Sequence, residues 1–316
     1  MTILEAEELF RDELYQIYDE AEARSLSYYV TEYVSGFSRA ILSANKSKVL
    51  SETEEASVLL ILNELKTGNP VQYVLGETEF YGLRFKVNPS VLIPRPETEE
   101  LVDWVLREVK GKRIKVESVR SGVSRVKPEL GAEPYEESRE AFRILDIGTG
   151  SGCIPIALKK HLPQGEVFGL DISEEALETA MGNAVLNRVE VKFVQGDIFE
   201  DVSYELSAIS SSPFNLIISN PPYITQKEKV QMHQNVLAYE PDIALFVPDE
   251  DPLVFYKAIA DFAIKHLLTT GALFFEINEA YGDEITTMLT GKGFAVVELR
   301  KDMQGKNRMV KAISRS

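Results

Sequence analysis

The sequence predicts an α/β protein in which a small helical bundle and a β-hairpin precede a seven-stranded sheet. Residues 1 to about 70 carry apolar residues at helical spacing and few glycines. From residue 142 onward, apolar runs of strand length alternate with helical stretches, as in sheets with crossover helices. Several of these runs end in glycine, acidic or Asn-Pro sequences, and open α/β sheets bind ligands at the carboxyl ends of their strands.

The composition indicates a globular protein without metal or disulfides. The chain has 316 residues, of which 44% are hydrophobic, enough for one large domain and a small one. The single cysteine, Cys153, cannot form a disulfide within the chain and is expected in the core, and three scattered histidines make no metal site. No run approaches the ~18 apolar residues of a membrane span. We expect a cytoplasmic protein with no membrane partner.

The charge balance argues against a nucleic-acid partner. Asp and Glu number 50 and Lys and Arg 34, so the formal net charge is −16 at pH 7. Such a surface repels phosphates rather than neutralising them. We therefore expect a protein partner and no direct contact with nucleic acid.

Residues 1–72 are predicted to form the N-terminal helical domain. Ser51, followed three residues later by Glu54, has the sequence of a capping box and marks the start of one helix. The aromatic residues of this domain are expected to pack inside it rather than to contact a partner: Tyr28, Tyr29, Tyr33 and Phe37.

Residues 73–95 are predicted to form a β-hairpin linker, and residues 96–316 the large domain. Runs rich in β-forming residues break at Gly76 and Gly82. Pro96 then suits the first turn of a helix. Beside it, Arg95 and Glu97 are either capping and solvent charges or contacts to a ligand.

Residues 111–141 are predicted to be a surface insertion in the large domain. Basic residues come first and acidic residues follow, with little apolar periodicity. A nucleic-acid patch is the alternative for the basic half. Aromatic residues are not interleaved there, however, and the acidic half opposes it.

A nucleoside pocket is predicted at the ends of the first three strands of the large domain. A glycine-rich loop after the first strand lets the backbone approach a ligand closely while helix amides face it. Asp171 ends the second strand about 20 residues later and suits ribose hydroxyls. Asp197 after the third strand suits an adenine amino group, and Ile198 can pack on the ring. The loop residues are Gly148, Thr149, Gly150, Ser151 and Gly152.

The expected cofactor is S-adenosylmethionine. Dinucleotide-binding loops read Gly-x-Gly-x-x-Gly, whereas Asp146 here stands two residues before the first glycine and the third glycine comes sooner. S-adenosylmethionine has no pyrophosphate to hold and carries a sulfonium and an ammonium group, which acidic surroundings favour. The large domain is therefore expected to be a Rossmann-like class I S-adenosylmethionine-dependent methyltransferase domain.

The fourth strand, 214–219, ends at the motif Asn220-Pro221-Pro222-Tyr223. The prolines cannot extend a sheet because they lack N–H donors. The Asn220 side-chain oxygen and the Pro221 carbonyl could accept the two N–H groups of a planar amide or amine and turn its lone pair toward a methyl donor. Tyr223 could stack on the flat group, so that catalysis would come mostly from orientation. A strand followed by a rigid turn is the plainer alternative.

The remaining chain completes the predicted sheet. A long connection through Tyr239-Glu-Pro is interpreted as a flap beside the substrate. A fifth strand follows at 272–277, and the runs 294–299 and 309–313 form a final antiparallel-like pair.

Several segments together resemble the release-factor glutamine N5-methyltransferases, the PrmC/HemK family. The Pro-Arg-Pro-Glu-Thr-Glu segment discriminates best, because DNA and RNA methyltransferases share the glycine loop and Asn-Pro-Pro-Tyr. The segments begin at Asn69 (Asn-Pro-Val-Gln-Tyr), Glu79 (Glu-Phe-Tyr-Gly), Leu92 (Leu-Ile-Pro-Arg-Pro-Glu-Thr-Glu), Asp146 (Asp-Ile-Gly-Thr-Gly-Ser-Gly), Ser219 (Ser-Asn-Pro-Pro-Tyr-Ile), Tyr239 (Tyr-Glu-Pro) and Asp302 (Asp-Met-Gln-Gly-Lys-Asn-Arg).

The resemblance implies methyl transfer from S-adenosylmethionine to the glutamine of the Gly-Gly-Gln motif in peptide chain release factors, which the N-terminal domain would engage. Asn220 and Pro221 would hold the amide, and Pro222 and Tyr223 would complete the slot. Residues 148–152, Asp171, Asp197, Ile198 and Asn220 would hold the cofactor. The alternatives are an N6-adenine DNA or RNA amino-methyltransferase, which the net charge opposes, and a catalytically idle binding protein, which the intact motifs oppose.

Overall fold

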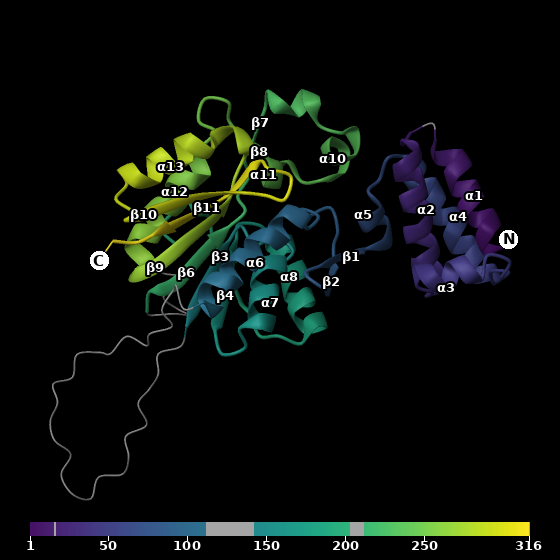
Figure 1. Ribbon diagram of the computed structural model, residues 1–316, viewed down its shortest axis with the longest axis horizontal. Coiled ribbons are helices and arrows are strands. Elements are labelled where there is room, and N and C mark those ends of the chain that lie inside the picture. The colour runs from purple at the N-terminus through teal and green to yellow at the C-terminus, as the bar shows by residue number, and fades with distance from the viewer. Residues whose placement is uncertain (16, 112–141, 203–211, 316) are drawn as a thin grey trace, which may run out of the picture. The chain divides into compact units, whose positions relative to one another are not determined.

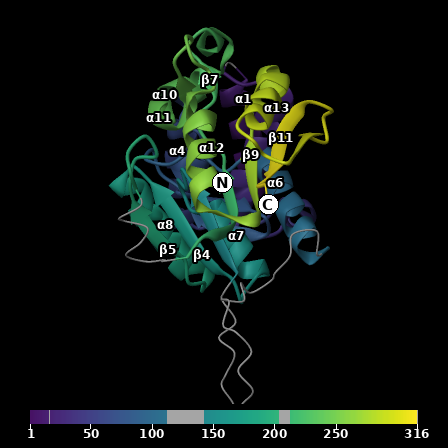
Figure 2. The same ribbon diagram turned by 90° about the vertical axis from the view of Figure 1, so that its left-hand side faces the viewer.

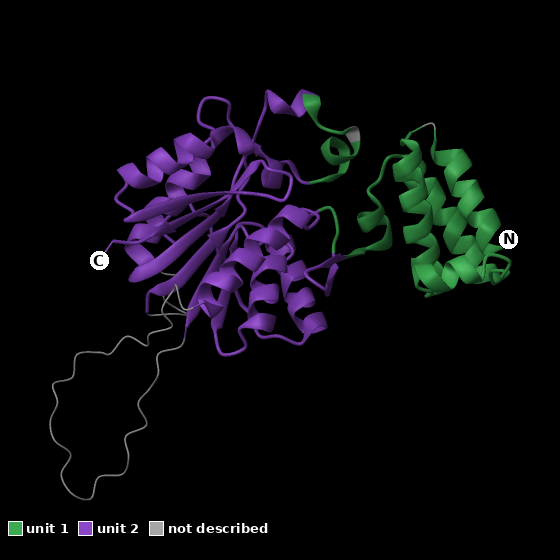
Figure 3. Cartoon of the chain, in the orientation of Figure 1, with its two compact units in different colours: residues 1–78, 87–89, 231–240 green, residues 79–86, 90–230, 241–316 purple. Residues whose placement is uncertain are grey.

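The computed structural model describes residues 1–15, 17–111, 142–202 and 212–315 (Figure 1). From residue 112 onward, the surface insertion predicted at 111–141 lies outside these residues. The chain divides into two compact units (Figure 3). The first comprises 1–78, 87–89 and 231–240, and the second comprises 79–86, 90–230 and 241–316.

The first unit is a helical bundle, as its periodicity predicts. Thr2 and Ser51 each form a capping box, with Glu5 and Glu54 respectively, and so fix the starts of two helices. The apolar faces enclose a core that includes Phe10. The helices are α1 (Ile3–Leu14), α2 (Glu20–Ser35), α3 (Arg39–Ala44), α4 (Glu52–Lys66) and α5 (Val71–Leu75).

Two aromatic side chains of α2 differ from their predicted burial. Tyr29 is 38% exposed and Tyr33 is 47% exposed, so the expectation that they pack inside the bundle is wrong. The period of a helix places every third or fourth residue inward, and Val30 and Thr31 hold that side. Tyr28 and Phe37 are partly buried, as expected.

A segment far away in the sequence completes the first unit. It contains the end of the 3₁₀ turn η1 (Glu228–Gln231) and helix α10 (Gln234–Tyr239). The Tyr239 hydroxyl donates to the Thr67 carbonyl oxygen at 3.0 Å, and Asn235 Nδ2 donates to the Tyr18 hydroxyl at 3.3 Å. These bonds fasten the segment to the helical bundle. Its interpretation as a flap beside the substrate stays a prediction.

A hairpin of β1 (Glu77–Phe80) and β2 (Leu83–Lys86) follows the bundle in sequence. Tyr81 and Gly82 have φ of 52° and 71°, as a two-residue hairpin turn with positive φ requires. Asn183 of α8 (Glu174–Asn187) accepts from Lys86 N–H at 2.6 Å and donates to the Lys86 carbonyl at 2.9 Å. The backbone of β2 is therefore paired by a helix side chain.

The second unit is built on a seven-stranded sheet, as the sequence predicts. The order is β10-β11-β9-β6-β3-β4-β5, with β11 antiparallel to both neighbours and the other pairs parallel. The strands are β3 (Arg143–Ile147), β4 (Glu166–Asp171), β5 (Lys192–Gln195), β6 (Phe214–Ser219), β9 (Leu267–Glu276), β10 (Val296–Lys301) and β11 (Asn307–Ile313).

Helices cover both faces of this sheet (Figures 1 and 2). Successive strand residues point to opposite faces, so Phe274 packs with α6 and α7 while Phe275 packs with α12 and α13. The helices are α6 (Pro96–Lys110), α7 (Cys153–His161), α12 (Val254–His266) and α13 (Gly282–Gly291). The unit also contains four short elements. They are α11 (Asp242–Leu245), η2 (Glu279–Tyr281) and the parallel strands β7 (Ile224–Thr225) and β8 (Phe246–Val247). None of the helices described is long and apolar enough to cross a membrane.

A buried ion pair joins α6 to the sheet. Lys311 Nζ of β11 lies 3.1 Å from Glu108 Oε2 of α6, and the two side chains are 6% and 5% exposed. Lys311 also lies 2.6 Å from Glu298 Oε2, whose side chain is 49% exposed. Because a buried ammonium needs its partner, Glu108 should contribute far more to stability than Glu298.

We predict that Glu108→Ala lowers the free energy of unfolding by roughly 3 kcal/mol or more, because it leaves a buried charge poorly paired. The matched variant Glu298→Ala, which removes the exposed partner, should cost less than ~1 kcal/mol. Urea unfolding measures both losses of stability. It is followed by the fluorescence of Trp104, the only tryptophan, whose ring centroid lies 5.4 Å from Lys311 Nζ. Equal losses in the two variants would contradict the prediction.

Candidate active site

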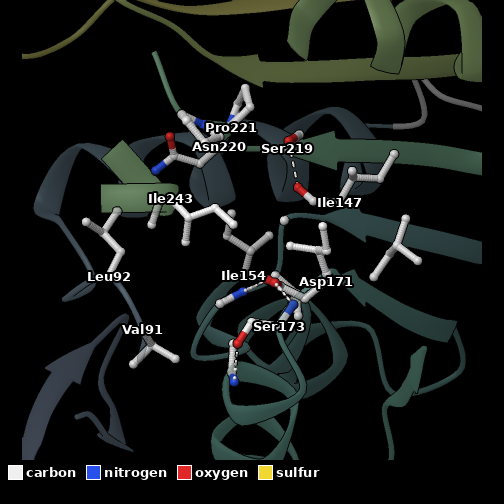
Figure 4. A pocket seen from close by; sticks show the side chains of 18 of the residues that line it. Val91, Leu92, Ile147, Ile154, Asp171, Ser173, Ser219, Asn220, Pro221 and Ile243 are labelled. Atoms are coloured by element: carbon white, nitrogen blue, oxygen red, sulfur yellow. Dashed lines mark hydrogen bonds between the residues drawn. The ribbon is translucent and has the colours of Figure 1, made fainter. Parts of the chain in front are cut away.

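A pocket opens at the carboxyl ends of β3, β4 and β6 in the second unit (Figure 4). The strand order reverses here, since β3 is followed in sequence by β4 on one side and has β6 on the other. The residues lining it include Val91, Leu92, Arg95, Thr98, Gly148, Thr149, Gly150, Ser151, Leu170, Asp171, Asp197, Ile198, Phe199, Asn220, Pro221, Pro222, Ile243 and Phe255. Most of the predicted site residues are therefore in one place.

The glycine loop forms the floor between β3 and α7. Gly148 and Gly150 have φ of 73° and 52°, which L side chains rarely adopt. Gly152 is outside the pocket lining, and a Cβ there would come within 3.0 Å of side-chain carbons of Ala180 and Ile156. The third glycine is thus required both by helix packing and by its φ of 78°, whereas the first two line the pocket.

Asp171, at the end of β4, is held rigidly by backbone amides. Its Oδ2 accepts from Gly150 N–H at 2.7 Å, and its Oδ1 accepts from Ser173 N–H at 3.0 Å. Burial raises the pKa of Asp171, and the amide donors oppose that shift. The carboxylate therefore fastens the glycine loop and also faces the pocket, where an oxygen can accept from a ligand hydroxyl.

The wall after β5 combines one acid with apolar side chains. One oxygen of Asp197 accepts from Phe199 N–H at 2.9 Å, which orients the carboxylate and leaves its other oxygen for a ligand amino group. Ile198 packs against the core on the α12 side. The rings of Phe199 and Phe255 lie 4.9 Å apart. A flat heterocycle with an amino group suits such a wall.

Asp146 lies buried just before the glycine loop. Its Oδ2 accepts from the Thr149 hydroxyl at 2.6 Å. Its Oδ1 has no hydrogen-bond partner in the part of the chain that the structure describes. Burial raises the pKa of Asp146 to about 7. Ionising this buried acid costs free energy, and a cationic group bound beside the loop would reduce that cost. The site therefore fits a ligand that bears an ammonium or sulfonium charge.

The Asn-Pro-Pro-Tyr motif follows β6, which is buried at all six positions. Asn220, Pro221 and Pro222 line the pocket, and Figure 4 shows Asn220 and Pro221 on the opposite side from Asp171 and Ser173. Tyr223 does not line it. The Tyr223 ring packs against the core on the α12 side, and its hydroxyl donates to Glu276 Oε1 at 3.2 Å. Its stacking on a substrate stays a prediction.

Two polar residues of the site were missed at the sequence level. The Thr98 hydroxyl lines the pocket, donates to Glu276 Oε2 at 2.7 Å and accepts from Asn220 Nδ2 at 3.2 Å. Glu276 is 1% exposed at the end of β9. In the sequence, Glu276 could have been recognised as an acid that ends the apolar run 272–275 of a strand. Thr98 could have been recognised from its place in the Pro-Arg-Pro-Glu-Thr-Glu segment.

The arrangement suits transfer of a group between two bound molecules. No three His, Cys, Asp or Glu of the described residues could hold a metal ion together. Cys153 is buried in the core, as expected, and burial raises the pKa of its thiol to about 12, so it is no nucleophile at neutral pH. The polar residues of the pocket lie in two groups, with Asp171 and Asp197 after β4 and β5 and Asn220 with Pro221 after β6.

The chain is similar to methyltransferases of known sequence and structure. Residues 134–242 match the family model described as "Methyltransferase small domain". The release factor glutamine methyltransferase of Flavobacterium psychrophilum is 40% identical over 304 residues, which cover 96% of this chain and 95% of the relative. That of Bacteroides thetaiotaomicron is 38% identical over 302 residues, 96% of each chain. The crystal structure of a release factor-specific protein-(glutamine-N5) methyltransferase from Alicyclobacillus acidocaldarius aligns with a TM-score of 0.40 and 22% identity over 73% of this chain and all of that one.

The buried acid before the loop generates a prediction about pH. The unfolded chain ionises Asp146 near its ordinary pKa of 3.8, whereas the folded protein does so only near 7. Folding is therefore penalised increasingly as pH rises from about 4 to about 7. Asp146→Asn stays neutral, so its melting temperature without ligand should exceed that of the parent by an amount that grows over this interval.

Thermal unfolding at pH 5 and pH 8 measures the effect. The exposed change Asp12→Asn, at a side chain that is 68% exposed, serves as the control and should show no such growth. A pH-independent difference for Asp146→Asn would show that the buried carboxyl does not titrate in this range.

Proposed function

The chain belongs to the release factor glutamine methyltransferases, and on this premise we propose that it methylates the side-chain amide nitrogen (N5) of the glutamine in the Gly-Gly-Gln motif of peptide chain release factors, with S-adenosylmethionine as donor. The observation that carries the proposal is the placement of Asn220 and Pro221 across the pocket from Asp171, in a lining that also includes Asp197. Relatives of the same length as the chain support it.

The nucleoside end of the pocket suits S-adenosylmethionine, which supplies an electrophilic methyl group on a sulfonium. Asp171 would accept from the ribose hydroxyls, and Asp197 from the adenine amino group, while Ile198 packs on the ring. The glycine loop, 148–152, would lie along the rest of the molecule. The buried Asp146 carboxyl would balance its positive charge.

The amide end suits a glutamine side chain. An amide nitrogen is a poor nucleophile because its lone pair is delocalised into the carbonyl. Asn220 Oδ1 and the Pro221 carbonyl would accept its two N–H groups and turn the lone pair toward the methyl group. Proline brings an acceptor without a competing N–H. Orientation and the exclusion of water would supply most of the rate enhancement. The amide nitrogen would take the methyl group as the sulfur–methyl bond breaks, and one N–H proton of the methylated amide would then pass to solvent.

The helical domain, residues 1–72, is the proposed contact for the release factor, with residues 73–95 as the linker to the catalytic domain at 96–316. Tyr29 and Tyr33 support this role, because exposed aromatic side chains are enriched at protein interfaces. The cytoplasm is the proposed location. An N6-adenine methyltransferase is not favoured, because the formal net charge of −16 opposes binding to phosphates.

We expect methyl transfer to a folded release factor, much slower transfer to a short Gly-Gly-Gln peptide, and none to DNA. The peptide lacks the surfaces that the helical domain would hold, and a base in DNA must first leave its stack. Mass spectrometry after incubation of each with labelled S-adenosylmethionine measures this. A factor whose motif glutamine is replaced by alanine is the control. Methylated adenine in DNA beside an unmodified factor would overturn the proposal.

We predict that Asn220→Ala lowers turnover by at least ~10²-fold, as removal of one orienting group in an active site typically does. Binding of S-adenosylmethionine, measured by calorimetry, should fall far less than turnover, because Asn220 is only one of the several residues expected to hold the cofactor and lies across the pocket from Asp171. Asn215→Ala is the matched control, since this buried amide of the same strand accepts from Arg143 N–H at 2.8 Å, away from the pocket. It should cost stability but keep turnover per folded molecule. Near-normal turnover in Asn220→Ala would refute the role of Asn220.

A further inference from the structure

A buried carboxylate lies behind the amide end of the pocket and receives two hydroxyl donors. Glu276, 1% exposed, ends β9 next to β6 in the sheet. Thr98 Oγ1 donates to its Oε2 at 2.7 Å, and the Tyr223 hydroxyl donates to its Oε1 at 3.2 Å. Each oxygen thus faces a different residue of the site.

The direction of these hydrogen bonds fixes the side chain of Asn220. A carboxylate only accepts, so the single hydroxyl proton of Thr98 goes to Glu276. The Thr98 oxygen can then only accept, and it takes a proton from Asn220 Nδ2 at 3.2 Å. An amide nitrogen cannot accept a hydrogen bond. The amide is therefore held with Nδ2 toward Thr98, and Oδ1 remains for the substrate.

The orientation decides whether the site can work as an acceptor. A carboxamide has nearly the same shape after a half-turn, but the turn exchanges its acceptor for two donors. In the turned orientation, donors of Asn220 would oppose the N–H groups of the substrate amide. Because the two orientations have nearly the same shape, packing does not select between them, and a hydrogen bond must make that selection.

The same carboxylate and its neighbour hold the other end of the motif. Besides the hydroxyl bond to Glu276, the backbone carbonyl of Tyr223 accepts from Asn278 Nδ2 at 3.1 Å. Tyr223 is thus anchored to residues at and just after the end of β9, whereas Asn220 is connected to Glu276 only through Thr98. Pro221 has a fixed φ, and Pro222 after it restricts its ψ, so the Pro221 carbonyl is positioned as well.

Two hydroxyl donors and a nearby positive charge favour the ionised, accepting form of Glu276, although burial keeps its pKa above the ordinary value. Burial raises the pKa of Glu276, while the donors Thr98 and Tyr223 and the charge of Arg308 lower it. Arg308 is itself held by Asp302, with Nε 3.1 Å from Oδ2.

We propose that Glu276 is a positioning residue that, through Thr98, orients the Asn220 amide so that its oxygen faces the glutamine amide of the substrate. This role rests on the proposed function. Neither Glu276 nor the Thr98 hydroxyl needs to touch the reacting atoms. Their removal should therefore slow turnover without weakening S-adenosylmethionine binding.

The test compares Thr98→Val with Thr98→Ser. Valine keeps the shape and removes the hydroxyl, whereas serine keeps the hydroxyl. For Thr98→Val we expect kcat for release factor methylation to fall about 10- to 100-fold, the loss typical of residues that orient a functional side chain through a hydrogen bond. The Kd for S-adenosylmethionine should stay unchanged. Thr98→Ser should retain most of kcat. Parent-like kcat in Thr98→Val, or an equal loss in Thr98→Ser, would overturn the proposal.

Glu276→Gln provides an independent arm. A glutamine accepts at one position only, so either Thr98 or Tyr223 loses its acceptor, and we expect kcat to fall here too. Tyr256→Phe is the control, because the Tyr256 hydroxyl donates at 3.3 Å to the backbone carbonyl of Glu276 and not to its carboxylate. It should keep turnover per folded molecule. A larger loss in Tyr256→Phe than in Glu276→Gln would assign the effect to the strand end and overturn the proposal.

The parent protein separates this proposal from the proposed function. If the parent methylates a release factor but the Thr98 variants do not differ, the positioning role fails and the function stands. If the parent methylates no release factor, the proposed function fails, and the positioning role, which rests on it, fails with it.

Discussion

The site depends on one constraint, the abrupt end of a fully buried central strand. β6 pairs with β3 and β9, and its six residues are all buried, so it cannot shift without breaking two ladders. Pro221 and Pro222 cannot continue those ladders. Asn220 is therefore held at a fixed point where the strand order reverses, and the pocket forms around that point.

Two acids at the neighbouring strand ends, Asp171 and Asp146, affect the stability of the protein as well as its pocket, and they do so in opposite ways. Asp171 fastens the glycine loop through two backbone amides, so its removal would loosen the loop as well as remove a ligand contact. Asp146 has one bonded and one unbonded oxygen and raises the cost of folding above pH 4. A group that destabilises the free protein in this way is expected where binding needs it.

Specificity of the amide end is a matter of hydrogen-bond direction rather than of shape. Asn220 can present either an acceptor or two donors to its ligand, and the bond to Thr98 selects the acceptor. The Thr98 hydroxyl in turn donates to Glu276, which does not line the pocket. This buried residue would therefore determine which atom Asn220 presents to the pocket. Such an arrangement is rigid because each donor has a single acceptor.

The sequence by itself determined the seven strands, the capping box at Ser51, the end of β6 and the glycine loop after β3, because each depends on local backbone restrictions or on a short periodicity. Only the tertiary structure decided the rest. The Thr98 bonds to Asn220 and Glu276 join residues 122 and 178 positions apart, and no local pattern encodes such a meeting. Packing with Ala180 decided the role of Gly152, and the direction of the α2 face decided the exposure of Tyr29 and Tyr33. These features depend on which surfaces meet after the elements have formed, which residue spacing along one chain does not specify.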